Sequence, residues 1–400
     1  MALHPFRGSF TQQQPIPEDG IAAANDVMRS GRLHRYNTQA GEEAETLLLE
    51  REYARWQGAR FCLAVTSGGQ AMQIALRASG VKPGDEVLTN AFTLAPVPGA
   101  IAAVGAEPVL VEITEDMVID LDDLKQKAVA SRAKVLMLSN MRGHLCDMDR
   151  LAALVDELGL TLIEDCAHTM GARWRGRLSG SFGRAGCFST QTYKHMNSGE
   201  GGFLTSDDAA FMARATVLSG SYMLFERHGA GPEAEAYGAA KYDMPNMSAR
   251  MDNLRAALLR PQLAHLDEAI ARWNERYKQV ADLIGQEPTI TLPARPGAEF
   301  FVGSSIQFRL PDLTDAGVQA FLKDTAARGV ELKWFGSKEP VAFTSTHQSW
   351  HYVPQQSLPQ TDAVLSRLFD MRIPLTFAVE DCALIGQHIV EAAQEVMAHA

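Results

Sequence analysis

Short apolar runs alternate with helical segments between residues 60 and 206, and this pattern constrains the fold more than any other feature. The runs are apolar throughout, which indicates strands that are buried on both faces of a sheet. Seven strands are predicted: Phe61–Thr66, Glu86–Asn90, Pro108–Glu112, Lys134–Ser139, Thr161–Glu164, Gly186–Ser189 and Gly202–Thr205. Helices are predicted between several of them: Ala71–Ser79, Leu121–Ala130 and Asp149–Leu158. This order predicts an α/β fold with a largely parallel sheet, and an antiparallel strand near its end because the last two strands follow each other closely.

The pattern changes after the seventh strand, which predicts a second and smaller domain. Ser219–Tyr242 is rich in Gly, Glu and Tyr, and a long loop in a compact domain is usually functional. An amphipathic helical pattern follows over residues 250–284, where Pro261 predicts a kink or break. We expect a large domain with an N-terminal arm over residues 1–264 and a small C-terminal α+β domain over 265–400. The small domain has predicted strands at Ser305–Leu310 and Val330–Lys333 and predicted helices at Ala316–Arg328, Thr361–Phe369 and Glu380–Ala400.

Composition excludes several classes of protein. Hydrophobic residues make up 46% and charged residues 21% of the chain, which is typical of a globular, soluble protein. The formal net charge of −11 argues against a nucleic-acid or anionic-membrane surface. The five cysteines are odd in number and include no C-x-x-C pair, so we expect neither a disulfide framework nor a thiolate zinc site. Met1–Phe10 lacks the apolar core of a secretory signal, and Leu94–Ala106 is too short and too broken for a membrane helix. We therefore expect a cytoplasmic protein.

The first candidate site is the stretch Thr66–Met72, which follows a strand and opens a helix. Its glycines let the backbone approach a ligand closely, and the free N–H groups of a first helical turn attract an anion. The stretch is neither a Walker loop nor a G-x-G-x-x-G motif, and taken alone it is better explained by a plain βα turn than by a phosphate site.

The second candidate is Glu164-Asp165, two acids at the end of an apolar strand and shortly before His168. Strand alternation sends the two acidic side chains to opposite faces of the sheet. Asp165 lies at the carboxyl edge of the sheet, where α/β proteins bind ligands. Its carboxylate could hold a cationic ring nitrogen, bind a metal, or only cap the following helix.

The third candidate is Lys194, which lies between a strand and a glycine-rich turn, among small polar residues. A lysine that forms a Schiff base must be partly desolvated so that its neutral amine is available near pH 7. A glycine cup, a strand-end acid and a later lysine are what a pyridoxal phosphate site requires. The phosphate needs donors, the ring nitrogen needs a carboxylate and the aldehyde needs a lysine.

Other polar clusters indicate no second site. His347 and His351 have the i, i+4 spacing of metal ligands, but their segment is not convincingly helical, so we predict two surface histidines and no metal site. The acidic run from Glu115 to Asp123 is typical of helix capping and solvated surface.

The chain also resembles the DegT/DnrJ/EryC1/StrS family of sugar aminotransferases through most of its length. Thr66–Met72 resembles the family's Ser-Gly-Thr-x-Ala-Leu phosphate motif, and Glu164–His168 is similar to its Glu-Asp-x-Ala-Gln. The most specific match combines Gly180–Gly183, Phe188-Ser189 and Lys194–Gly202. Further ordered matches are Val81–Val87, Val104–Val109, Asp147–Asp149, Arg250–Leu263 and Ile373–Leu375.

The resemblance implies a fold-type I pyridoxal phosphate-dependent transferase with a mainly parallel seven-stranded sheet. Lys194 would form the Schiff base with the cofactor and then act as the base in a 1,3-proton shift. Asp165 would pair with the pyridinium nitrogen. His168, where the family usually has Gln, would lie near the phenolic oxygen of the cofactor. The phosphate would be held by Gly68, Gly69 and Ser189.

The resemblance further implies a homodimer in which a second subunit completes each site, with residues 219–249 as the segment that crosses over. Three departures from the family pattern concern the substrate more than the cofactor. Leu94 replaces the aromatic residue over the ring, with Phe92 the nearest aromatic, and Gly68-Gly69 replaces Gly-Thr. Arg142 replaces an apolar residue, and its guanidinium could meet an acidic group or make a surface ion pair. The sequence does not decide which arginine, if any, binds a substrate anion; the candidates are Arg142, Arg227 and Arg250.

The predicted function is therefore the transfer of an amino group from glutamate or glutamine to a keto acceptor, which the resemblance favours as a keto-sugar or keto-cyclitol. A smaller ketone or aldehyde is the alternative acceptor. Related dehydratases carry His in place of the lysine, and Lys194 argues against that activity. A non-catalytic regulatory relative would be expected to have lost Asp165, Ser189 or Lys194, and all three are present.

Overall fold

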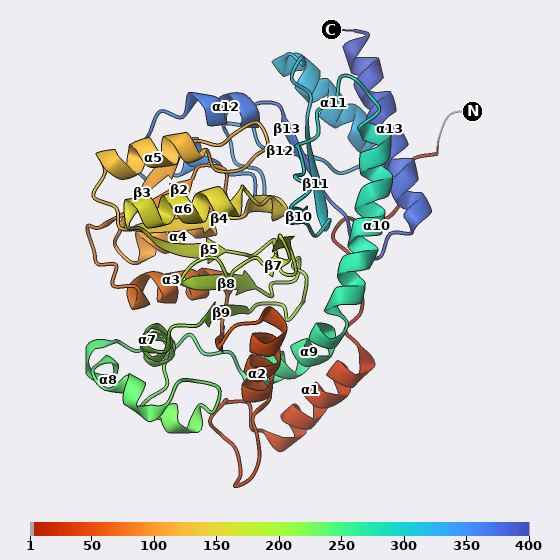
Figure 1. The fold of residues 1–400 in the computed structure, drawn as a ribbon. Helices are drawn as coiled ribbons and strands as arrows, with labels where there is room; N and C mark the ends of the chain where they lie inside the picture. The colour runs from red at the N-terminus through yellow and green to blue at the C-terminus, as the bar shows by residue number, and fades with distance from the viewer. Residues whose placement is uncertain (1–3, 400) are drawn as a thin grey trace.

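The computed structural model describes residues 4–399 and contains the expected α/β sheet at its centre (Figure 1). The seven strands have the order β1-β9-β8-β5-β4-β2-β3. Their bounds are β1 Phe61–Val65, β2 Glu86–Asn90, β3 Glu107–Val111, β4 Val135–Ser139, β5 Thr161–Asp165, β8 Ala185–Ser189 and β9 Gly202–Ser206. β3, β2, β4, β5 and β8 run parallel, whereas β9 is antiparallel to both of its neighbours, β8 and β1. All seven predicted strands and the antiparallel member are thus confirmed.

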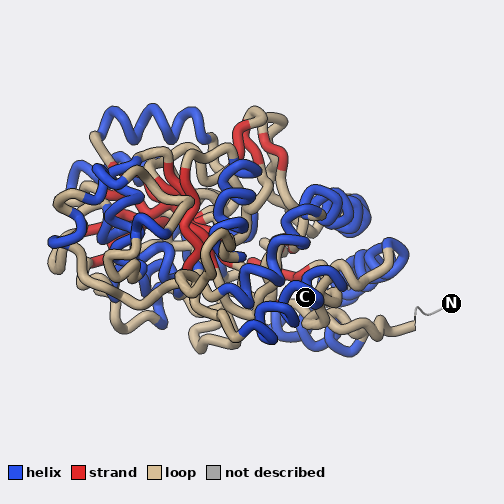
Figure 2. Tube along the Cα trace, turned by 90° about the horizontal axis from the view of Figure 1, so that it is seen from below, coloured by secondary structure: helices blue, strands red, loops and turns tan. Residues whose placement is uncertain are grey.

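Helices cover both faces of this sheet, as the continuous apolar strands predicted (Figure 2). One face packs against α3 (Gly68–Ala78), α4 (Pro96–Ala103) and α7 (Ala209–Ser219). The other packs against α2 (Glu45–Gln57), α5 (Leu121–Ala130), α6 (Met148–Leu158) and α9 (Asn253–Ala264). Within β4, Val135 and Met137 point into the first core and Leu136 and Leu138 into the second, so alternate side chains of one strand serve two layers.

A second, antiparallel sheet has the strand order β11-β13-β12. Its strands are β11 Ser305–Arg309, β12 Lys333–Trp334 and β13 Leu368–Arg372, and its helices are α10 Leu266–Ile284, α11 Asp315–Ala327 and α13 Val379–Met397. These elements share one apolar core, which Phe6 and Phe10 of the N-terminal segment also enter. The boundary at residues 264 and 265 stays a prediction.

Two predictions in this region are wrong in detail. The helix expected over Thr361–Phe369 is α12 (Pro359–Leu365), and the chain then turns into β13, which the sequence pattern did not indicate. The strand expected at Val330–Lys333 lies further on, as β12. The last helix was predicted to end at Ala400, which lies outside the described residues.

The long helical pattern breaks between α9 and α10 at His265, four residues after Pro261. The loop that precedes it contains three short helical turns, η2 (Phe225–Arg227), η3 (Ala234–Tyr237) and α8 (Ala240–Asp243). The remaining elements are α1 Glu18–Ser30, η1 Met141–Gly143, η4 His347–Ser349, and the short strands β6 Arg173–Trp174, β7 Arg177–Leu178 and β10 Glu299–Phe300.

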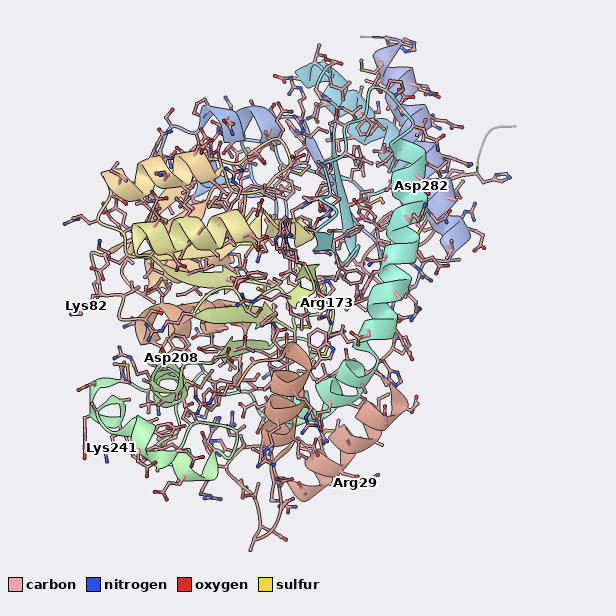
Figure 3. All side chains as sticks on the ribbon, viewed as in Figure 1. Arg29, Lys82, Arg173, Asp208, Lys241 and Asp282 are labelled. Atoms are coloured by element: carbon pink, nitrogen blue, oxygen red, sulfur yellow. The ribbon has the colours of Figure 1, made fainter. Side chains whose placement is uncertain are left out.

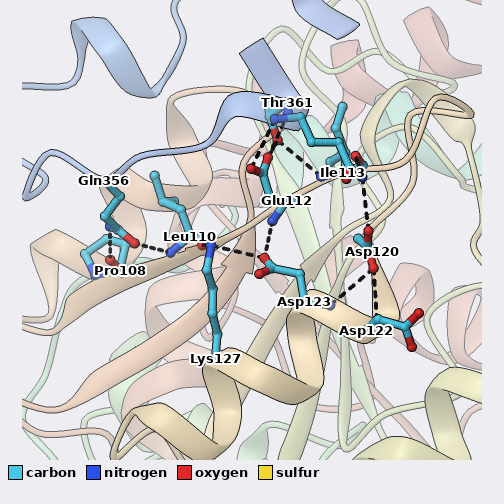
Figure 4. Close-up of polar contacts among 11 residues, drawn as sticks. Pro108, Leu110, Glu112, Ile113, Asp120, Asp122, Asp123, Lys127, Gln356 and Thr361 are labelled. Atoms are coloured by element: carbon cyan, nitrogen blue, oxygen red, sulfur yellow. Dashed lines mark hydrogen bonds and ion pairs between the residues drawn. The ribbon is translucent and has the colours of Figure 1, made fainter. Parts of the chain in front are cut away.

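The C-terminal part of the chain also covers the open edge of the seven-stranded sheet (Figure 4). Gln356 pairs with edge strand β3 through its side chain, accepting from the N–H of Leu110 and donating to the carbonyl of Pro108. The Glu112 carboxylate accepts from the N–H and the hydroxyl of Thr361 at the start of α12. Residues 356–361 therefore cover an edge that would otherwise offer unpaired backbone groups.

Charged side chains lie around the outside of the molecule, as Figure 3 shows for Arg29, Lys82 and Lys241. No helix within residues 4–399 combines the length and the hydropathy needed to cross a bilayer. His351 is exposed as predicted, but His347 is buried and its Nε2 lies 2.7 Å from Oδ1 of Asp362, so the surface prediction is wrong for His347. Asp120 caps α5 by accepting from two backbone N–H groups, as the acidic run predicted.

Candidate active site

All seven residues predicted to hold or attack the cofactor line one cavity of about 490 Å³. The cavity opens at the carboxyl ends of β1, β4, β5 and β8, because the chain turns away from the sheet after each of these strands. The seven residues are Gly68, Gly69, Leu94, Asp165, His168, Ser189 and Lys194. The structure therefore brings together positions that are up to 126 residues apart (Gly68 to Lys194) in the sequence.

The N-terminus of α3 forms a cup at one end of this cavity. The Ser67 side chain caps the helix by accepting from the N–H of Gln70 at 3.0 Å. The N–H groups of Gly68 and Gly69 find no acceptor among residues 4–399, so both remain available to an anion. A Cβ on Gly68 would lie 3.0 Å from Cβ of Ser189, so glycine at this position keeps the cup open. The Ser189 hydroxyl oxygen accepts from the N–H of Gln191 and keeps its own proton for a ligand.

Asp165 ends β5 with its carboxylate in the cavity, and Glu164 points to the other side of the strand. Glu164 accepts from the N–H groups of Gly180, Phe182 and Gly183, which is a structural role. Asp165 accepts from the Ser139 hydroxyl at 3.0 Å and from the N–H of Ala167 at 3.1 Å. A turn follows β5, so the helix-cap alternative for Asp165 is wrong. Burial raises the pKa of Asp165, partly offset by the Ala167 N–H, by Lys194 and by Ser139, so a cationic ligand atom here would stabilise its ionised form.

Lys194 and His168 form the closest polar pair in the cavity, with 2.7 Å between Nζ and Nε2. The backbone N–H of Arg142 points at Nδ1 of His168 at 3.4 Å, which assigns the proton of the neutral ring to Nε2. Nε2 then donates to Nζ, which can accept only as a neutral amine. Loss of hydration, with the charges of Arg142 and Arg372, lowers the pKa of Lys194 to about 7. Burial likewise holds the pKa of His168 well below its usual value.

The cup, the carboxylate and the lysine of this cavity match the groups of pyridoxal phosphate. The cup offers uncommitted N–H groups to a phosphate, the Asp165 carboxylate has no cationic partner in direct contact within residues 4–399, and Lys194 can be a neutral amine near pH 7.

Comparison with known proteins agrees with this chemistry. The sequence profile of the DegT/DnrJ/EryC1/StrS aminotransferase family matches residues 15–390. The chain belongs to this family.

Three relatives of the chain are informative. The chain is 33% identical to 3-amino-5-hydroxybenzoate synthase of Amycolatopsis mediterranei (strain S699), over 88% of this chain and 89% of the relative. The crystal structure of a 3-amino-5-hydroxybenzoic acid synthase superposes with a TM-score of 0.81 and 26% identity, over 98% of this chain and 100% of the other. DesV of S. venezuelae, solved in complex with a ketimine intermediate, superposes with a TM-score of 0.78 and 26% identity, over 94% of each chain. The protein is thus a fold-type I, pyridoxal phosphate-dependent aminotransferase, as the resemblance predicted.

The departures from the family pattern have clear positions in the structure. Leu94 lines the cavity as an aliphatic residue, whereas Phe92 is buried beneath it and packs edge-on against Phe335. Arg142 is buried and donates to Oδ2 of Asp370 at 2.7 Å, so the alternative of a surface ion pair is wrong. Its backbone has a φ of 54°, a left-handed conformation that is rare outside glycine. In this conformation the backbone N–H of Arg142 points at Nδ1 of His168.

The other two arginines left open by the sequence lie outside the cavity. Arg227 donates to the carbonyl of Tyr36 at 2.6 Å, and Arg250 donates to the carbonyl of Gly220 at 2.8 Å. Neither residue lines the active-site cavity or its neighbour.

Sequence reasoning missed a group of cavity residues from the far end of the chain. Arg372 and Phe343 line the cavity together with Tyr193, which precedes the lysine. A second cavity of about 290 Å³ adjoins the first and shares Arg142, His168, Tyr193, Lys194 and Arg372 with it. The one available signal was that Arg372 stands directly before the Ile373–Leu375 motif of the family.

Proposed function

We propose that this aminotransferase moves the amino group of glutamate or glutamine to a keto-sugar or keto-cyclitol. The observation that carries the proposal is the position of Lys194: its Nζ lies 2.7 Å from Nε2 of His168, in the same cavity as the Asp165 carboxylate and the α3 cup. The names of the relatives favour a cyclic acceptor: one makes an aminohydroxybenzoate, and another, 34% identical over 67% of this chain, is a spore coat polysaccharide biosynthesis protein of Bacillus subtilis (strain 168).

Each residue of the site has a proposed role. When bound, pyridoxal phosphate supplies an aldehyde for the amine and a ring that takes up the electron pair released from the substrate carbon. Gly68, Gly69 and Ser189 would bind the phosphate, and the Asp165 carboxylate would keep the ring nitrogen protonated. Leu94 would exclude water from one side of the ring.

Lys194 and His168 would carry the proton chemistry. Nζ of Lys194 would hold the cofactor before substrate arrives. Once released, it would take a proton from the α-carbon of the donor and deliver it to the cofactor carbon that carries the nitrogen, as a 1,3-proton shift requires. Its low pKa suits this role, because a base with a pKa near the working pH is neutral often enough to accept a proton. His168 would donate from Nε2 toward Nζ or toward a cofactor oxygen in the same place.

We further propose a cytoplasmic homodimer in which the partner subunit completes each site. Residues 219–249 are the proposed crossover segment. The exposure of Tyr222, Met223 and Tyr242 in this segment supports the proposal, because large apolar side chains on a surface are typical of an interface. Five unpaired, buried cysteines are in keeping with a reducing compartment.

The donor half-reaction can be tested by absorbance. The purified protein with bound pyridoxal phosphate is mixed with L-glutamate and, separately, with L-glutamine, in the absence of any acceptor. Loss of the visible band and growth of a near-ultraviolet band would support the proposed donor. A band that responds to neither amino acid would contradict it.

The acceptor is then sought with the amino-loaded protein. Nucleotide-linked keto-sugars, a keto-cyclitol and small keto acids or aldehydes are added one at a time. Return of the visible band with a cyclic acceptor at lower concentration than with any small one supports the proposal, whereas a preference for a small ketone or aldehyde would establish the alternative.

A further inference from the structure

Arg372 is a cation on the wall of the active site to which the proposed chemistry gives no ligand. It lies at the end of β13, is partly buried, and lines both adjoining cavities together with Lys194. Among residues 4–399 its guanidinium makes no ion pair and donates no hydrogen bond. Its five N–H groups are therefore available to a ligand.

Two aromatic rings support this guanidinium. Its central carbon lies 3.9 Å from the centroid of Tyr193 and 5.1 Å from that of Phe343. Stacking on aromatic faces restrains the plane of an arginine while it leaves the N–H groups, which lie in that plane, free to bind. Arg372 is thus held in position without using its donors.

The carboxylate of Asp370 is not free to neutralise Arg372, because it already binds two other residues. Asp370, two residues earlier on β13 and on the same face of the strand, gives Oδ2 to Arg142 and Oδ1 to Nε2 of Gln307, each at 2.7 Å. Of the acids that line the larger cavity, Asp165 is hydrogen-bonded to Ser139 and Ala167, and Glu200 is exposed. The wall beside Lys194 therefore carries two guanidinium groups, those of Arg142 and Arg372. Among residues 4–399, only Arg142 has a carboxylate partner, which is Asp370.

The chemistry of the amino donor indicates a ligand for the unpaired guanidinium of Arg372. A donor must bring its amine to the position that Nζ of Lys194 leaves. In an α-amino acid the carboxylate is bonded to the same carbon as the amine, so a group that binds it must lie beside Lys194. Guanidinium is the side chain best suited to a carboxylate, which it can bind through two parallel hydrogen bonds.

We propose that Arg372 binds the α-carboxylate of the amino donor and thereby selects α-amino acids over amines that lack this group. The inference rests on the proposed donor half-reaction and applies to glutamate and glutamine alike, because both carry the α-carboxylate. Arg372 would determine the donor rather than move a proton.

The test compares wild type, Arg372→Gln, Arg372→Lys and the control Arg132→Gln, whose side chain is 85% exposed beside Glu86. Each protein is loaded with pyridoxal phosphate, and its visible band is followed in single turnover against L-glutamate and against L-isoglutamine, in which the α-carboxylate is an amide. We expect Arg372→Gln to raise the half-saturating glutamate concentration by at least about 30-fold, as expected for loss of one partner of a desolvated charge pair. The Lys variant should recover part of this loss, and the control should match wild type.

The isoglutamine comparison separates carboxylate binding from general damage to the site. Wild type should prefer glutamate strongly, whereas Arg372→Gln should treat the two compounds about equally and still retain its cofactor. Loss of both reactions to the same extent, or an unchanged preference for glutamate, would overturn the inference. An effect confined to the acceptor half-reaction would overturn it as well, by assigning Arg372 to an anionic group of the acceptor.

Calorimetric titration with succinate, a dicarboxylate without an amine, gives a readout that does not depend on turnover. Wild type should bind succinate, and Arg372→Gln should bind it at least about tenfold more weakly. If no amino acid converts the wild-type cofactor, the proposed donor reaction fails, while succinate binding still decides the role of Arg372. Equal binding by wild type and variant, or no binding by wild type, would count against the inference.

Discussion

At the scale of single residues, the proposed chemistry depends on the short contact between Lys194 and His168. Nδ1 of His168 accepts from the backbone N–H of Arg142, which leaves the ring proton on Nε2. Nε2 can then donate to Nζ of Lys194 only if this amine is neutral, so the ring favours a neutral lysine before any cofactor binds. Loss of hydration acts in the same direction, because it penalises an ammonium group more than an amine. The hydrogen bond from His168 and the loss of hydration thus both favour the neutral form of the Lys194 amine.

A pH dependence follows from the lowered pKa of Lys194. Only the neutral amine attacks an aldehyde, and a pKa of about 7 makes this form predominant above that pH. The rate at which saturating pyridoxal phosphate attaches to the cofactor-free protein should fall about tenfold from pH 8 to pH 6 and level off above pH 8. Stopped-flow absorbance measures this rate. A rate that still climbs steeply at pH 9 would mean that the lysine keeps its ordinary pKa.

Removal of the amine should abolish turnover without unfolding the chain. We expect Lys194→Ala to lower transamination by roughly 10³-fold or more and to remove the visible absorbance of the lysine-bound cofactor. The circular dichroism spectrum should not change, because the side chain faces the cavity rather than the core. Lys82→Ala is the matched control, since Lys82 is exposed on the periphery (Figure 3) and should behave as wild type. Full activity of Lys194→Ala would refute its proposed role.

At the scale of elements, the first turn of α3 is the proposed binding site for the phosphate of the cofactor. Two glycines begin this helix, and they differ in what surrounds them. A Cβ on Gly68 would meet Ser189 at 3.0 Å and the carbonyl oxygen of Phe188 at 3.3 Å, whereas one on Gly69 would have only the Ser67 hydroxyl nearby, at 3.7 Å. The helix can therefore tolerate a methyl group at one position and not at the other.

This difference gives a matched pair of variants. Gly68→Ala should weaken pyridoxal phosphate binding by about tenfold or more, because Ser189 and the helix start must move apart and the cup changes shape. Gly69→Ala should bind the cofactor within about threefold of wild type. Alanine costs no helix propensity at either position, so both variants should unfold near the wild-type temperature. The dissociation constant, measured by fluorescence quenching, is the readout, and equal affinities of the two variants would show that the crowding at Gly68 is unimportant.

The sequence pattern predicted some helices and strands and missed others, for physical reasons. The strands of the large sheet are short, continuous apolar runs, and this pattern was enough to find all seven of them. Strand β13 was not predicted because Asp370 and Arg372 interrupt its apolar run. The role of each polar residue depends on distant parts of the chain, since Asp370 pairs with Arg142 and Arg372 lines the cavity. His347 was misjudged for a similar reason, since its partner Asp362 belongs to a helix 15 residues away. Local patterns do not show such partners.

At the scale of the whole molecule, a buried ion pair joins the two sheets at the active site. Arg142 follows β4 of the large sheet and Asp370 lies in β13 of the small one, and their side chains are 5% and 0% exposed. Gln356 and Thr361 make a second connection at β3 (Figure 4). The cavity is therefore built from both parts of the chain, and the contribution of β13 to it could not be read from the motifs of the first part.

Loss of this ion pair should be costly. Asp370→Asn leaves the Arg142 guanidinium buried without a counter-charge and should lower the free energy of unfolding by about 3 kcal/mol. The matched control is Glu157→Gln, which breaks the exposed pair with Lys125 and should cost less than about 1 kcal/mol. Urea denaturation of both variants provides the comparison. Equal stability of the two would mean that the pair does little to hold the sheets together.

The proposed chemistry depends most on one covalent bond, which Lys194 would form with the cofactor. Borohydride reduction of the protein loaded with pyridoxal phosphate makes this bond permanent, and mass spectrometry of a proteolytic digest then locates it. We predict that the phosphopyridoxyl group lies on the peptide that contains Lys194, with the other lysines unmodified. A label on another lysine, or no label on a protein that has bound the cofactor, would contradict it.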